Sequence, residues 1–166
     1  NGGTGATMEQ EWDEFGEFEL EVEKGGEIVL EQAFLEARFG REFGLPLELG
    51  LRLGHLLVPF GMISSYHLPV MFSGTRRPES EEALIPSTWH ESGLEFFLAW
   101  KGLRLQVQAI TGLDSTGFSS ARFIAGGTQR RFEAVQSNDW AVAARLEYAG
   151  LRGLLFGGAF YTTATT

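Results

Sequence analysis

The chain has 166 residues, no cysteine and a formal net charge of −9 at pH 7. The lack of cysteine excludes disulfides and thiolate chemistry, and the acidic balance argues against a nucleic-acid partner, which would require a basic surface. The longest apolar run without a charge covers residues 56–63, far short of the roughly 20 residues of a membrane-spanning helix.

Alternation of apolar and polar residues is the main structural signal, and it begins at residues 17–23 (EFELEVE). After a turn at KGGE it returns at residues 31–39 (EQAFLEARF), where Phe34 breaks the pattern, and at residues 47–54 (LELGLRLG). A period of two residues predicts β-strands. A helix does not fit, because the leucines of residues 47–54 would spread around the whole cylinder.

The second half of the chain continues the same alternation. It predicts strands over residues 91–100, 103–109 and 140–148, and a last strand that ends near Tyr161. The seven strands of about eight to ten residues are close to the ~9–11 residues of a transmembrane β-strand and longer than the about 5–6 of an average soluble one. With 22 glycines, 14 phenylalanines and only 5 prolines, the composition also favours an all-β protein with turns.

The lengths of the connections alternate along the chain. Short turns are expected at residues 40–46, 101–102 and 149–151, and long loops at about 59–90 and 112–139. Outer-membrane barrels have short periplasmic turns and longer extracellular loops. The connection at KGG, between the first two strands, would then be a short connection on the extracellular side, where the long loops also lie.

The two faces of the predicted strands differ sharply. One carries glutamate, glutamine, arginine and glycine, and the other carries apolar residues without an intervening charge. Trp140 and Tyr148 lie at the two ends of one strand on the apolar face, about 20 Å apart across a bilayer, near the ~25 Å apolar band that aromatic girdles flank in such barrels. The alternative is a soluble β-sandwich whose glutamate-rich faces point to water.

Four segments carry a family resemblance: EQAFLEARF, LRLGHLLVPFGMISSYH, RRPESEEALIPSTWHESG and VQAITGLDSTGFS. Over residues 27–160 the chain resembles bacterial outer-membrane porins of the phosphate-selective porin O/P type. The resemblance implies a barrel of 16–18 strands in a trimer. Seven strands cannot close such a barrel, so we expect residues 1–166 to be one partial barrel domain, an antiparallel up-and-down meander from about the N-terminal half.

The segment VPFG resembles the place where a strand of this family leaves the bilayer and bends into a long loop. Pro59 lacks an N–H and is poor inside a ladder, and Gly61 permits a sharp turn. Arg52, earlier in the same strand, would then face the pore.

No motif for catalysis or metal binding emerges from the residues. His55, His67 and His90 are scattered without metal-ligand spacing, and the glycine-rich GTQRR and GGTGAT lack the P-loop lysine. The paired acids of the first strand fit calcium binding or acid–base work less well than a solvated lumen wall. We therefore expect neither an enzyme nor a cofactor.

The arginines are the candidate solute contacts. They lie on the polar face or in the first long loop, namely Arg38, Arg52, Arg76, Arg77, Arg104 and Arg145. Rings of arginine or lysine select anions in a pore, which would suit phosphate, but glutamates share the same face and could pair with these arginines. Selectivity for anions and general diffusion of small hydrophilic solutes both remain open.

The sequence thus predicts an outer-membrane porin whose partners are lipid and small hydrophilic solutes. We expect its narrowest part to come from the loop at 59–90 with Arg52, Arg76, Arg77 and Arg104, because the apolar residues at positions 68 and 70–72 need a surface to pack against. A soluble β-sandwich binding module and a structural barrel with a plugged lumen are the alternatives.

Overall fold

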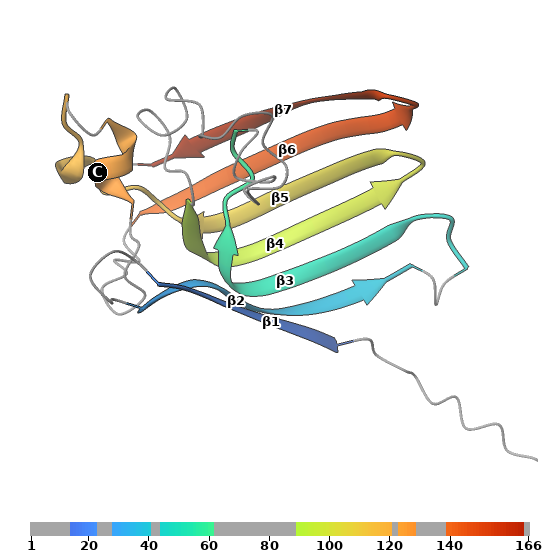
Figure 1. The fold of residues 1–166 in the computed structure, drawn as a ribbon, viewed down its shortest axis with the longest axis horizontal. Helices are drawn as coiled ribbons and strands as arrows, with labels where there is room; N and C mark the ends of the chain where they lie inside the picture. The colour runs from blue at the N-terminus through green and yellow to red at the C-terminus, as the bar shows by residue number, and fades with distance from the viewer. Residues whose placement is uncertain are drawn as a thin grey trace, which may run out of the picture.

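The structure, a computed structural model, describes residues 14–22, 28–40, 44–61, 89–120, 123–128 and 139–164. Seven strands form a single antiparallel sheet in chain order (Figure 1). Their bounds are β1 (Glu14–Val22), β2 (Ile28–Phe39), β3 (Glu48–Leu57), β4 (His90–Trp100), β5 (Leu103–Thr111), β6 (Trp140–Leu151) and β7 (Leu154–Thr163). Because β1 and β7 are the two edges, the sheet is an open meander. The predicted all-β antiparallel meander is confirmed.

The predicted strand positions hold, with one turn displaced. β6 runs on to Leu151, which pairs with Leu154, so the turn consists of Arg152 and Gly153 instead of residues 149–151. Gly153 has a φ of 78°, which glycine adopts without steric cost. An irregularity in pairing between Tyr148 and Leu151 absorbs the extra residues. The predicted KGG connection lies outside the described residues.

The hairpin between β4 and β5 follows from its turn residues. Lys101 and Gly102 both have positive φ, 46° and 86°, the pattern of a type I′ turn, whose twist matches that of two antiparallel strands. The turn sets Trp100 opposite Leu103 and thereby Ala99 opposite Arg104. A two-residue turn thus fixes the register of both strands.

Strand register places the charged residues on one face. Glu36, Arg52, Glu95 and Gln108 lie side by side in one row across β2, β3, β4 and β5, and residues directly opposite one another project to the same face. This face is concave, since residues of the five strands β2 to β6 surround one hollow of about 180 Å³.

The burial of side chains is inverted relative to a soluble sheet. Charged or amide side chains of the concave face are almost fully buried, namely Glu36, Glu91, Glu95, Gln108, Arg145 and Glu147. Large apolar side chains of the opposite, convex face are exposed, namely Leu35, Leu51, Leu53, Leu94, Phe96, Trp100, Trp140, Val142, Leu146, Phe156 and Phe160. Leu35 and Leu53, for example, are 71% and 61% exposed.

A compact apolar core exists only at the loop end of the described sheet, and it involves the concave side. Val58, Trp89 and Leu113, which follow or precede strands, are buried together with Ile110 and Ala141 of β5 and β6. Two short 3-10 segments, Ser115–Gly117 and Ile124–Gly127, lie beyond β5. Within the described ranges no helix is long and apolar enough to cross a membrane.

Candidate solute-contact wall on the concave face

Arg52 is the centre of a charged network in the middle of the concave wall. Its Nη1 donates to Glu95 on β4 at 2.6 Å, and its Nε donates to Glu36 on β2. Arg38 also bonds Glu36 and lies 3.3 Å from Glu48. The side chains of Glu36 and Glu95 are each 2% exposed, and a buried carboxylate is tolerated only where it is paired and hydrogen-bonded.

Two aromatic rings hold the Arg52 guanidinium in place. Its Cζ lies 5.2 Å from the ring centroid of Phe34 and 4.6 Å from that of Phe97. Both distances are within the range of a cation–π interaction. Gly50 makes room for the ring of Phe97, because a Cβ at Gly50 would lie 2.1 Å from Phe97 Cζ.

Gln108 extends the network toward the loop end. Its Nε2 donates to Glu95 Oε2 at 2.6 Å and to the carbonyl oxygen of Leu57 at 2.9 Å. Glu95 therefore accepts from Arg52 with one oxygen and from Gln108 with the other. The three residues come from three consecutive strands and cross-link them on this face.

The start of the first long loop turns inward across the concave face. In Figure 1 the chain leaves β3 and crosses in front of β4 and β5 toward β6. Val58 donates its backbone N–H to Trp89 at 2.7 Å, and the carbonyl oxygen of Gly61 accepts from Nη1 of Arg145 on β6. Arg145 also bonds Glu147 at 2.5 Å. One arginine thus joins the loop segment Val58–Gly61, called the inward segment below, to the opposite wall.

The inward segment packs against aromatic residues. The rings of Phe60 and Trp89 have centroids 6.1 Å apart, and Trp89 lies 4.8 Å from Tyr161 of β7. Trp89 Nε1 donates to Glu91 at 3.1 Å, and Thr111 Oγ1 donates to the other oxygen of Glu91 at 2.7 Å. The inward segment and these aromatic and hydrogen-bonded side chains therefore fill the loop end of the concave face.

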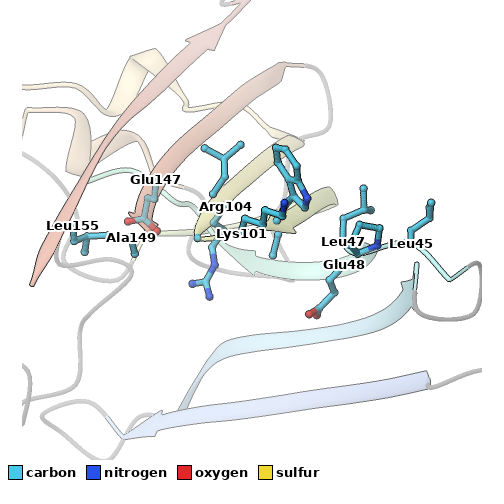
Figure 2. Close-up of a pocket in the computed structure, with 13 residues that line it drawn as sticks. Leu45, Leu47, Glu48, Lys101, Arg104, Glu147, Ala149 and Leu155 are labelled. Atoms are coloured by element: carbon cyan, nitrogen blue, oxygen red, sulfur yellow. The ribbon is translucent and has the colours of Figure 1, made fainter. Parts of the chain in front are cut away.

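A larger hollow opens at the turn end of the same face (Figure 2). It has a volume of about 590 Å³ and is lined by residues of β3 to β7 and of the connecting turns, including Glu48, Lys101, Arg104 and Glu147. Arg104 and Glu147 also line the 180 Å³ hollow next to Arg52. These two residues therefore border both spaces.

The structure places four of the predicted site residues on the concave wall. Arg38, Arg52 and Arg145 are ion-paired, and Arg104 is exposed on the wall of both hollows. Arg38 and Arg52 meet through Glu36. Arg76 and Arg77 lie outside the described residues.

Several residues of the wall are absent from the sequence-based prediction. Phe97 and Trp89 both contribute, and neither has the residue type expected for a solute contact. Gly61 is predicted only as a turn residue of the VPFG segment. Phe34 gave the one usable signal, because it interrupts the alternation on the polar face. The structure explains this interruption, because the Phe34 ring lies against the guanidinium of Arg52 on that face.

No protein-family model matches the chain, and no solved structure matches it. An uncharacterized protein of Aquifex aeolicus (strain VF5) is 37% identical over 75 residues, which are 45% of this chain and 16% of that relative. The matched part of this chain therefore spans less than a fifth of the length of the relative, which is more than twice as long as this chain.

Proposed function

We propose that this chain forms part of the wall of a bacterial outer-membrane β-barrel porin, through which small hydrophilic solutes diffuse. The inverted burial carries the proposal: leucine, phenylalanine and tryptophan side chains of the convex face are exposed, while glutamate, glutamine and arginine side chains of the concave face are buried. In water an apolar surface of this extent would be costly. Against lipid it is the expected outer surface of a barrel with a polar lumen.

Strand length and aromatic placement agree with this proposal. The described strands have 9 to 12 residues, as expected for ~9–11-residue strands that cross a bilayer at a tilt. Trp100, Tyr148 and Phe156 lie at the turn end of the sheet and Trp140 at the loop end. Tryptophan and tyrosine favour the two membrane–water interfaces.

An open sheet of seven strands needs further strands to enclose a lumen. The relative from Aquifex aeolicus is more than twice as long as this chain, so a protein of that length has room for them. In this proposal the complete barrel has 16–18 strands and assembles as a trimer, as the resemblance to phosphate-selective porins implies. It carries out no chemical reaction and needs no cofactor.

The inward segment supplies the constriction of the proposed pore. A barrel of 16 or more strands otherwise encloses a wide aqueous channel, and a loop that folds inward is able to narrow it. Val58–Gly61 folds across the concave face, held by Trp89 and Arg145, and this position supports the proposed constriction. A preference for phosphate or another anion is not part of this core proposal, because glutamates largely neutralise the paired arginines of the wall.

The soluble β-sandwich receives no support from a specific observation. A sandwich would bury the leucine faces between two stacked sheets. The described strands form one sheet, and its leucine face is exposed.

Tryptophan fluorescence tests the position of the two faces. Variants of the full-length protein that each retain one tryptophan would be reconstituted in vesicles that contain brominated lipid, which quenches on contact. Trp140, which is 59% exposed on the convex face, should be quenched strongly, whereas Trp89, which is 1% exposed, should be nearly unaffected. Equal and weak quenching of both would contradict the membrane assignment. Conductance of the same protein in planar bilayers tests the pore itself.

A further inference from the structure

Most of the positive charge on the described concave wall is neutralised by fixed partners. Arg52 bridges Glu36 and Glu95, Arg38 bonds Glu36, and Arg145 bonds Glu147. An ion-paired guanidinium has part of its donors occupied, and the carboxylate beside it cancels most of its field on a passing solute. These three arginines therefore stabilise the wall more than they attract anions.

Arg104 differs from the other arginines of the wall. It is exposed, and within the described part of the chain it makes no ion pair. Its neighbours in register are Ala99, which carries no charge, and Glu147, which is bound to Arg145 at 2.5 Å. In Figure 2 the guanidinium of Arg104 points away from the carboxylate of Glu147.

The position of Arg104 also suits contact with a solute. It borders the hollow of about 590 Å³ at the turn end and the hollow of about 180 Å³ beside Arg52. A solute that moves along this wall from one hollow to the other passes its side chain. Lys101 adds a second positive charge on the lining of the larger hollow.

We infer that Arg104 is the residue of this wall that contacts the anionic group of a passing solute, while Arg38, Arg52 and Arg145 serve as structural ion pairs. The inference rests on the proposed pore function. The guanidinium presents two parallel N–H donors, which match the oxygens of a carboxylate or a phosphate. The solute class is therefore a small organic acid or a phosphate-bearing molecule.

The test is the ion selectivity of the full-length protein in planar bilayers. Reversal potentials in a potassium chloride gradient would be compared for the wild type, Arg104→Gln, Arg104→Lys and Arg152→Gln. Arg152 is the matched control, because it is exposed in the turn between β6 and β7 and lines neither hollow beside Arg104. Conductance in potassium acetate and in potassium phosphate, relative to chloride, would distinguish the two kinds of anionic group.

Arg104→Gln should lower the anion-to-cation permeability ratio by about fivefold, the effect of one unit charge about 4 Å from an ion in water. Arg104→Lys should retain most of the ratio, and Arg152→Gln should leave it unchanged. The anion whose relative conductance falls more in Arg104→Gln identifies the preferred group. If Arg104→Gln channels have normal conductance and an unchanged permeability ratio, the inference about Arg104 is wrong, whereas the proposed pore function is supported. Absence of channels in the wild type would instead overturn the proposed function.

Discussion

Arg52 on β3 and Glu95 on β4 face each other in register and form an ion pair, with 2.6 Å between Nη1 and Oε1. The pair is the centre of a network, because Arg52 also donates to Glu36 and Gln108 also donates to Glu95. Strands β2 to β5 are thus joined by side chains as well as by their backbone ladder.

Removal of the Arg52 charge should therefore destabilise the sheet. Arg52→Gln leaves two buried carboxylates without their shared cation, and we expect a loss of roughly 2–3 kcal/mol in the free energy of unfolding. That is less than the 3–5 kcal/mol of a fully buried pair, because Arg52 retains 26% exposure. Urea unfolding in detergent micelles would measure it. The additional change Glu95→Gln should recover part of the loss, and strict additivity of the two changes would contradict the coupling.

Gly50 offers a test of the aromatic support for Arg52. A Cβ at this position would overlap the ring of Phe97, so Gly50→Ala should displace the ring and cost about 1–3 kcal/mol in the free energy of unfolding, the usual range for overpacking. Gly158→Ala is the matched control, because a Cβ there would meet no heavy atom within 4 Å. Equal unfolding midpoints for the two variants would show that the Phe97 ring is not confined.

The predictable part of this fold is the part set by local pattern. Period-two alternation placed Arg52, Glu95 and Gln108 on the polar face, and the Lys101–Gly102 turn is short enough to fix the register of its hairpin. The face of a strand residue follows from its parity alone, so no tertiary information was needed for these assignments.

The contacts that shape the wall could not be predicted in the same way. Gly61 and Arg145 are 84 residues apart in the chain, and neither residue type identifies the other as a partner. Phe97 is an apolar residue on the polar face of its strand. Its ring fits there because Gly50, on the neighbouring strand, has no side chain. The choice among Arg38, Arg52, Arg104 and Arg145 as solute contact likewise depends on which carboxylates are already paired.

Leu53 and Gln106 provide a test of the two faces by stability. Leu53 is 61% exposed on the convex face, and Gln106 lines the concave hollow. If the convex face contacts lipid, Leu53→Arg should cost about 2–4 kcal/mol in a bilayer, falling toward ~1 kcal/mol near an interface. Gln106→Arg should cost much less, because its charge reaches water. Unfolding from vesicles measures both, and similar small costs would contradict a lipid-facing surface.

Asp114 gives a prediction of pH dependence in the loop after β5. Hydrogen bonds from the side chain and backbone N–H of Thr116 lower the pKa of the Asp114 carboxyl. A lowered pKa means that the turn is stabilised while the carboxylate is charged, and that this contribution is lost as the pH falls through the lowered value. The Thr116 amide signal should therefore titrate at a lower pH in the folded protein than in a peptide of residues 112–118. Coinciding midpoints would show that the turn does not favour the charged form.

Arg145 tests the role of the inward segment. Arg145→Gln removes the guanidinium that donates to Gly61 and also pairs with Glu147, so the segment should be released from β6 and the proposed pore should widen. We expect a larger single-channel conductance with more current noise, since a loop held at fewer points fluctuates more. Glu147→Gln is the matched control: it removes one partner of Arg145 but keeps the bond to Gly61, and its conductance should stay nearer the wild-type level. A conductance that rises equally in both variants would assign the effect to lost charge on the wall instead of release of the segment.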